Sequence, residues 1–207
     1  GINLSEEQRQ QLIGRCYTNN ERLRKLLEEV SLITRMEDGS QLIGKEPIVI
    51  NNIIHEIAEE LEIMPAEERF FLHTNFNEQV IIEGNLSLIA SIFRNLTENA
   101  IAYSNGKNIY ISLIENNKKW CKIRFEDDGC GVEEKQLSRL FERFYRVDKG
   151  RSRQMGGTGL GLAIVKSFTE AQGGKVQVDL EDDLFKVTVS FPRVQVVQIP
   201  VAETVTE

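Results

Sequence analysis

Two asparagines four residues apart are the first residues of this sequence that could do chemistry. Asn95 and Asn99 fall within a predicted helix over 85–104, where four-residue spacing places them one above the other beside its apolar stripe. A side-chain amide at the edge of a buried face needs hydrogen-bond partners. A hydrated Mg²⁺ ion carrying phosphates would supply them, because magnesium prefers oxygen ligands and keeps its waters. For the pair alone, hydrogen bonds to neighbouring backbone or exposure to solvent are the favoured explanation.

A carboxylate ends one row of an alternating strand. Side chains alternate between faces along a strand, so Asp127 points the same way as the apolar residues at 121, 123 and 125. A carboxylate turned toward the core is costly unless it accepts good hydrogen bonds. The exocyclic amine of adenine is a suitable donor. The alternative is an aspartate that only begins the turn at Asp128-Gly129.

Glycines gather at two places after this strand. Gly129 and Gly131 permit positive φ and let a flat base approach the backbone, although ordinary turns share this pattern. The run over 156–161 leads into a predicted helix, and amides at a helix N-terminus favour phosphate. It is neither a P-loop nor a Rossmann fingerprint, because no Lys-Ser or Lys-Thr follows it and no strand directly precedes it. We therefore favour phosphate binding over a simple hinge.

The segment between the glycine runs combines aromatic and basic residues. Residues 141–146 include three aromatics and two arginines, and Lys149, Arg151 and Arg153 follow. A cation-bearing segment between glycine runs is typical of a lid that reaches phosphates. A solvated loop accounts for Arg151 and Arg153 but is less natural for the aromatic part.

The N-terminal segment over 4–36 predicts one long helix. Ser5 and Gln8 resemble a capping box at its start, and Gly39 can end it. A narrow stripe at alternating steps of four and three predicts packing against another helix. The stripe comprises Leu12, Cys16, Asn19, Leu23, Leu26, Val30 and Ile33.

The remaining pattern predicts helices combined with a mainly antiparallel sheet, an α+β sandwich that positions these candidate residues. The tail over 194–207 has no obvious core partner, and we expect it to be disordered or an added edge. The predicted elements are helices over 50–64 (ended by Pro65), 85–104 and 158–172, short strands over 70–76 and 80–82, and hairpins pairing 109–113 with 121–125 and 176–180 with 185–191. The apolar stripe of the helix over 85–104 is Leu86, Ile89, Phe93, Leu96, Ala100 and Tyr103.

Composition narrows the classes of partner. The 207 residues are 41% hydrophobic with a net charge of −7, which suits a soluble globular protein and argues against a nucleic-acid partner. The three cysteines are widely spaced, so we expect reduced thiols rather than a zinc site. No apolar run approaches the roughly 18 residues that span a bilayer, and no signal peptide is visible. We therefore expect no membrane contact by these residues.

Four motifs in the same order resemble those of bacterial two-component sensor histidine kinases. Residues 95–104 resemble the N box, 127–132 the first glycine box, 140–148 the F box and 157–162 the second glycine box. The likeness covers roughly 47–192. It implies a two-layer α/β sandwich of the Bergerat (GHKL) type that binds Mg²⁺ and ATP. The first helix is similar to the second helix of the dimerisation and histidine-phosphotransfer domain.

The resemblance divides the chain and assigns roles. Residues 1–44 would be part of the dimerisation domain, 45–193 the ATP-binding catalytic domain and 194–207 a tail. Asn99 would ligate Mg²⁺, Asn95 would assist through a metal-bound water, and Arg146 would approach the phosphates, so that Asn95 and Arg146 are the catalytic candidates. Asp127 would bind the adenine amine. The other nucleotide contacts would be Tyr103, Gly129, Gly131, Tyr145, Lys149, Gly157, Thr158, Gly159, Leu160 and Gly161.

Three features depart from the family pattern. Ala102 stands where a basic residue is common, and Cys130 replaces the commoner proline or aliphatic residue. The phospho-accepting histidine motif is absent. His55 lies well over 100° from the apolar stripe of its helix and lacks the downstream Arg-x-Pro pattern, so we predict an exposed helix residue. His73 lies in a predicted strand and receives no role.

The resemblance implies a histidine protein kinase that passes the γ-phosphoryl group of ATP to a histidine outside these residues. From there it would reach an aspartate of a response-regulator receiver domain. The full-length protein would be a homodimer, and this region the cytoplasmic part of a membrane-anchored bacterial sensor. These residues alone would bind ATP without autophosphorylating.

Two other functions share the pattern. Gyrase-like or chaperone-like ATPases use a glutamate to activate water where this chain has Asn95, so we disfavour hydrolysis. A non-catalytic module gated by nucleotide is favoured only by Ala102 and the missing acceptor histidine.

Overall fold

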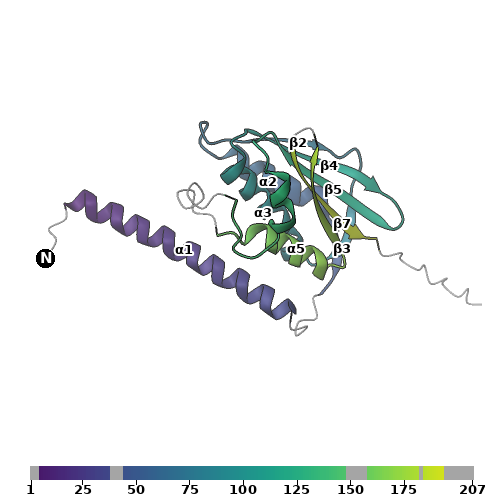
Figure 1. Ribbon diagram of the computed structural model, residues 1–207, viewed down its shortest axis with the longest axis horizontal. Helices are drawn as coiled ribbons and strands as arrows, with labels where there is room; N and C mark the ends of the chain where they lie inside the picture. Colours follow the sequence, from purple (N-terminus) through teal and green to yellow (C-terminus); the bar gives the residue numbers. More distant parts are fainter. Residues whose placement is uncertain (1–4, 38–43, 148–157, 182–183, 194–207) are drawn as a thin grey trace, which may run out of the picture.

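A five-stranded sheet forms one layer of the protein, in a computed structural model that describes residues 5–37, 44–147, 158–181 and 184–193 (Figure 1). Its strand order is β2-β4-β5-β7-β6, parallel between β2 and β4 and antiparallel elsewhere. Both predicted hairpins are confirmed, and their registers place Ile111 opposite Phe125 and Val178 opposite Val187. The strands are β2 (Phe71–Asn75), β4 (Asn108–Asn116), β5 (Trp120–Asp127), β6 (Lys175–Glu181) and β7 (Leu184–Pro192).

Three helices cover one face of this sheet (Figure 1). They are α2 (Ile50–Glu62), α3 (Leu86–Asn99) and α5 (Gly161–Ala171). Their apolar stripes meet the inward rows of the strands in a single core, and each large side chain removed from water contributes about 1.5–3 kcal/mol. The predicted α+β sandwich is confirmed. Fully buried members include Ile57, Phe93, Ile111, Ile123 and Phe168.

A second sheet contains a strand that was not predicted, paired with the short strand predicted over 80–82. Strand β1 (Glu46–Val49) pairs antiparallel with β3 (Ile81–Gly84). Only Ile48 of β1 is buried, and the strand contains Pro47, so its four residues show no clear alternation. The ladder leads directly into α2, where the Ile50 amide donates to the Val80 carbonyl at 2.9 Å.

The long first helix, α1 (Glu6–Glu37), begins at the predicted capping box. The Ser5 amide donates to Gln8 Oε1 at 3.0 Å, and the Gln8 amide donates to Ser5 Oγ at 3.2 Å. The helix runs beside α5 and contacts it (Figure 1). Three residues of its predicted stripe, Leu12, Leu23 and Val30, are 53%, 58% and 40% exposed. Gly39 and the tail over 194–207 lie outside the described residues.

The predicted single helix over 85–104 was wrong at its C-terminal end. Helix α3 ends at Asn99, and a π-helical turn, η1 (Ala100–Ser104), continues the chain. A π turn holds more residues than an α turn, so the step of about 100° per residue fails beyond Asn99. Tyr103, predicted within the apolar stripe, is 39% exposed as a result. Leu86, at the first turn, is 48% exposed.

Smaller corrections concern element ends and the charged segment. Helix α2 ends at Glu62, and α5 begins at Gly161 rather than at residue 158. The segment after the first glycine box contains a 3₁₀ helix, η2 (Glu134–Arg139). Among the described helices, none has the length and hydropathy needed to cross a membrane.

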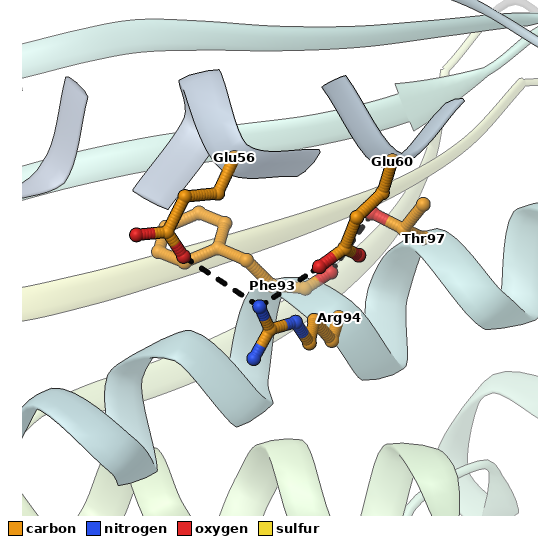
Figure 2. A network of polar contacts seen from close by, with 5 residues as sticks. All are labelled: Glu56, Glu60, Phe93, Arg94 and Thr97. Carbon is orange, nitrogen blue, oxygen red and sulfur yellow. Dashed lines mark hydrogen bonds and ion pairs between the residues drawn. The ribbon is translucent and has the colours of Figure 1, made fainter. Parts of the chain in front are cut away.

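One side chain joins α2 to α3 on the surface (Figure 2). The Arg94 guanidinium lies 2.9 Å from a Glu60 carboxylate oxygen and 3.5 Å from one of Glu56. Behind it, Thr97 Oγ1 donates to the Phe93 carbonyl one turn back at 3.0 Å. The sequence analysis did not foresee these contacts, because the two helices are separated by the strands β2 and β3.

Candidate functional site

The asparagine pair of α3 faces the first turn of α5. A Cβ atom added to Gly161 would lie 3.0 Å from Asn99 Oδ1 and 3.4 Å from Asn95 Oδ1. Only a glycine lets the N-terminus of α5 approach the two amides this closely without displacing them. The N box and the second glycine box, about 60 residues apart in the sequence, thus lie against each other.

The two asparagines differ in how their amides are satisfied. Asn95 is buried, and its Nδ2 donates to the Ser91 carbonyl at 2.9 Å and to Ser91 Oγ at 3.2 Å. Asn99 Nδ2 is also buried, but it has no hydrogen-bond partner among the described residues. An unsatisfied buried donor costs about 1–3 kcal/mol. Backbone bonding therefore accounts for Asn95, whereas Asn99 has an amide available to a ligand.

Asp127 ends the inward row of β5, as its phase predicted. Cys121, Ile123 and Phe125 are buried, and the partly buried Asp127 follows them. Its Oδ1 accepts a hydrogen bond from the Gly129 amide at 3.0 Å. Burial raises the pKa of this carboxyl above its ordinary value; the Gly129 N–H opposes the rise, and the neighbouring Asp128 charge adds to it. A hydrogen-bond donor on a ligand would relieve this cost.

The first glycine box packs against the end of the π-helical turn. A Cβ atom at Gly129 would lie 2.3 Å from the Ser104 Cβ, so the contact requires glycine. The Cys130 amide donates to the Ser104 carbonyl at 2.8 Å. Gly131 has φ of 63°, which favours glycine. Tyr103, the residue before Ser104, is exposed beside this contact.

The F-box segment is joined to the second glycine box. The Phe144 amide donates to the Gly159 carbonyl at 2.8 Å. Gly159 has φ of 74°, and a Cβ there would lie 2.9 Å from the Phe144 backbone, so two constraints require glycine. Next to it, Thr158 Oγ1 accepts from the Leu160 amide at 3.2 Å, and the Leu160 side chain is buried.

Tyr145 and Arg146, one aromatic and one basic residue of the F-box segment, were predicted to contact the nucleotide. The Tyr145 ring is partly buried, and the Arg139 guanidinium carbon lies 4.2 Å from its centroid. Arg146 is also partly buried, and its Nε and Nη2 have no hydrogen-bond partner among the described residues. Guanidinium N–H groups pair well with phosphate oxygens. Lys149 and Gly157, the other predicted contacts of this region, lie outside the described residues.

Sequence reasoning treated Asp128 only as a turn residue. Its Oδ1 accepts from the Lys107 and Asn108 amides, each at 2.8 Å, and its Oδ2 accepts from Asn108 Nδ2 at 2.6 Å. Slight desolvation raises the pKa of this exposed carboxyl, but the hydrogen bonds from Asn108 and Lys107 outweigh it and hold that pKa below its ordinary value. An Asp-Gly turn signal cannot reveal partners that lie some 20 residues earlier.

A family profile covers the same region. The profile of the histidine kinase-, DNA gyrase B-, and HSP90-like ATPases matches residues 84–195, which include all four motifs. The chain belongs to this family. Membership in this ATPase family implies that the chain binds ATP.

Relatives within the family point to its kinase branch. The sensor protein kinase WalK of Staphylococcus haemolyticus (strain JCSC1435) is 34% identical over 158 residues, covering 75% of this chain and 26% of the relative. A WalK of Staphylococcus aureus is 33% identical over 173 residues, covering 83% of this chain and 41% of the relative. The chain therefore spans less than half the length of either relative. The predicted resemblance to the catalytic domain of sensor histidine kinases is confirmed.

Solved structures share the fold of this histidine kinase-like domain. The Acinetobacter baumannii histidine kinase AdeS superposes with a TM-score of 0.74 at 19% identity, covering 94% of this chain and 88% of that one. Full-length ShkA, solved in complex with AMPPNP, gives 0.76 at 21% identity, covering 94% of this chain and 41% of that one. At such identities the likeness establishes the fold alone.

Proposed function

We propose that the chain is the ATP-binding catalytic region of a sensor histidine kinase, which transfers the γ-phosphoryl group of ATP to a histidine. One observation carries the proposal more than any other. The Asn99 amide is buried without a hydrogen-bond partner among the described residues, beside the glycine-lined start of α5. The unsatisfied N–H groups of Asn99 Nδ2 suit a phosphate oxygen near a helix N-terminus, and the Oδ1 of the same amide is the atom that could ligate a metal ion.

The proposed roles follow the chemistry of each side chain. Asn99 would hold Mg²⁺, which, when bound, neutralises charge on the triphosphate. Asn95 would act through a metal-bound water, and the unsatisfied N–H groups of Arg146 would bind phosphate oxygens. Asp127 would accept a hydrogen bond from the adenine amine. The remaining proposed nucleotide contacts are Tyr103, Gly129, Gly131, Tyr145, Lys149, Gly157, Thr158, Gly159, Leu160 and Gly161.

Catalysis by these residues would consist of positioning and charge neutralisation, as in other phosphoryl transfers. The amides at the N-terminus of α5 would orient the triphosphate, and the Arg146 guanidinium would balance charge on the transferred group. The F-box segment, hydrogen-bonded to Gly159, would exclude water from the phosphates.

Hydrolysis is the less favoured outcome. Asn95 stands where a water-activating glutamate would be needed, and an amide cannot take a proton from water. Glu98 is exposed and lines a cleft on the α2 side of α3 together with Glu60 and Arg94. That position turns its carboxylate away from Gly161.

The likeness to sensor kinases supports a wider proposal. We propose that residues 1–44 belong to a dimerisation and phosphotransfer domain, that 45–193 form the catalytic domain and that 194–207 are a tail. In the full-length protein these would work as a homodimer. The phosphoryl group would pass to the receiver domain of a response regulator, and the region would lie on the cytoplasmic side of a membrane-anchored sensor.

The experiment supplies the acceptor separately. The chain is mixed with radiolabelled Mg-ATP and a helical hairpin carrying the acceptor histidine of a related sensor kinase, and acid-labile phosphohistidine is quantified. We expect label on the hairpin with the wild-type chain, and a loss of at least about 100-fold with Asn99→Ala. Asn52→Ala, which removes an exposed helical asparagine on α2, is the matched control and should transfer normally. Release of inorganic phosphate with no phosphohistidine would contradict the kinase and favour an ATPase.

A further inference from the structure

A row of hydrogen bonds runs from the edge strand β2 to the first glycine box. His73 Nε2 lies 2.8 Å from Asn108 Oδ1, and Asn108 Nδ2 lies 2.6 Å from Asp128 Oδ2. The His73 ring stacks on Tyr110, with ring centroids 4.8 Å apart. These residues come from β2, β4 and the turn after β5, so the row crosses three neighbouring segments at one end of the sheet.

The carboxylate of Asp128, at the end of this row, determines which group donates and which accepts in each hydrogen bond. An ionised carboxylate only accepts hydrogen bonds, so Asn108 must turn its NH₂ group to Asp128 and its oxygen to His73. His73 Nε2 must then carry a hydrogen and donate it. In the neutral ring, the proton is therefore on Nε2 rather than Nδ1.

The other oxygen of Asp128 holds the loop that follows the π-helical turn. Oδ1 accepts from the Lys107 and Asn108 amides, and a Cβ atom at Gly106 would lie 2.0 Å from it. Ser104 closes the loop, since its Oγ accepts from the Gly106 amide at 2.9 Å. The carboxylate thus joins the N-box end of the site to the glycine box that carries Asp127.

We propose that Asp128, oriented by Asn108 and His73, is a positioning residue for nucleotide binding. It holds the backbone of Asp127 and Gly129 at a set distance from η1. This distance fixes the place of the Asp127 carboxylate, which is the proposed adenine contact. The inference rests on the proposed ATP site. Asp128 itself is exposed and contacts no nucleotide group in this account; its effect passes through the adjacent peptide bond. Misplacement of binding groups by about 1 Å can cost about 100-fold.

The substitution Asp128→Asn should change the tautomer of the His73 ring. If Asp128 acted only on the adjacent backbone amides, the tautomer would not change. Asp128→Asn keeps one oxygen for the two backbone N–H groups but presents an NH₂ group to Asn108. Asn108 must then reverse its amide and turn its NH₂ group toward His73. His73 Nε2 becomes an acceptor, so the ring proton moves to Nδ1.

Two measurements on the whole chain test the proposal. Nitrogen-15 NMR of labelled histidine reports the tautomer in nucleotide-free protein, and His55→Gln leaves His73 as the one remaining histidine of the two. We expect Nε2–H in the wild type and Nδ1–H in Asp128→Asn. Calorimetry with Mg-ATP should show an affinity loss of about tenfold or more for Asp128→Ala and a smaller loss for Asp128→Asn. Asp179→Asn, on the far edge strand β6, is the matched control and should change neither reading.

A further variant keeps the test decisive if Asp128→Ala unfolds. His73→Phe retains an aromatic ring to stack on Tyr110 but removes the donor, and we expect it to weaken Mg-ATP binding a few-fold with little change in melting temperature. Equal affinity of the wild type, Asp128→Asn and His73→Phe would overturn the positioning role, as would an Nδ1–H tautomer in the wild type. Failure of the wild type itself to bind ATP would instead refute the nucleotide site, and the positioning role would fall with it.

Discussion

At the scale of single residues, hydrogen-bond satisfaction separates structural from ligand-binding side chains. Asn95 and Asn99 have the same chemistry and adjacent places on α3. Ser91 satisfies Asn95, whereas the Asn99 amide nitrogen is buried with no partner among the described residues. Native proteins rarely leave such a group unsatisfied, so Asn99 is the asparagine most dependent on a ligand.

Asp127 also carries a cost in the absence of ligand. Burial raises its pKa, so the ionised form is less favourable in the folded than in the unfolded chain. This penalty applies at neutral pH and fades as the pH falls through the folded-state pKa. Asp127→Asn cannot ionise, and we therefore expect a slightly higher melting temperature at pH 7, with the advantage shrinking toward pH 4.

The same substitution should weaken ATP binding by at least about tenfold, because an amide cannot offer the adenine amine the same pair of acceptor oxygens. Differential scanning calorimetry and ATP titration at pH 7 check the two effects. A variant that binds ATP as tightly as the wild type would show that the adenine contact is elsewhere.

The three cysteines should differ in reactivity. Burial raises the pKa of Cys121 to about 11, an effect opposed by Arg193 and aided by Glu78, whereas Cys16 and Cys130 are exposed. The thiolate is the reactive form. We expect iodoacetamide at pH 8 to alkylate Cys16 and Cys130 in the folded chain and Cys121 only after denaturation, as read by peptide mass spectrometry. Early modification of Cys121 would indicate that β5 opens readily.

At the scale of elements, the close approach of α5 to Asn99 of α3 requires a glycine at position 161. Gly161→Ala would place a Cβ 3.0 Å from Asn99 Oδ1, so the amide must shift by a few tenths of an ångström. Since alanine favours helix by up to about 1 kcal/mol over glycine, we expect unchanged or slightly higher stability but weaker Mg-ATP binding. Gly14→Ala on α1, with open space around it, should raise helix stability without affecting affinity. Loss of stability without loss of affinity in Gly161→Ala would contradict this view.

The ion pairs that Arg94 makes between α2 and α3 should have little effect on ATP affinity. Arg94 is 44% exposed in its side chain, and its pairs with Glu56 and Glu60 are surface ion pairs (Figure 2). Such pairs contribute at most about 1 kcal/mol. We expect Arg94→Ala to lower stability by that amount or less in urea unfolding and to leave ATP affinity unchanged. A large drop in affinity would mean that α2 helps to position the asparagine pair.

Periodicity predicted most of the elements because each strand and helix buries one face. The alternation over 109–113 and 121–125 predicted the two strands of the central hairpin, in which Ile111 lies opposite Phe125. The π-helical turn escaped prediction, since Ser104 is held by bonds to Gly106 and Cys130 rather than by local propensity. Strand β1 escaped because four residues containing Pro47 show no clear alternation.

For the candidate site, the sequence predicted which side chains to consider but not their contacts. Asn95, Asn99 and Asp127 could be singled out because the sequence shows on which face of a helix or strand each of them lies. The motifs could not distinguish the satisfied amide from the unsatisfied one, since that depends on Ser91 and on the approach of Gly161. The roles of His73 and Asn108 depend on strand pairing that no local pattern encodes.

At the scale of the whole molecule, the sheet and its three helices form one body, and α1 runs beside α5 (Figure 1). The stripe residues Leu12, Leu23 and Val30 of α1 are exposed. The central claim is that ATP binds where the Asn99 amide and the Arg146 guanidinium have unsatisfied N–H groups. NMR of the side-chain N–H resonances during titration with Mg-ATP tests it directly. We expect the Asn99 NH₂ and Arg146 Nε–H signals to shift to saturation together with the backbone amide of Gly161. Saturable ATP binding that leaves all three unmoved would contradict it.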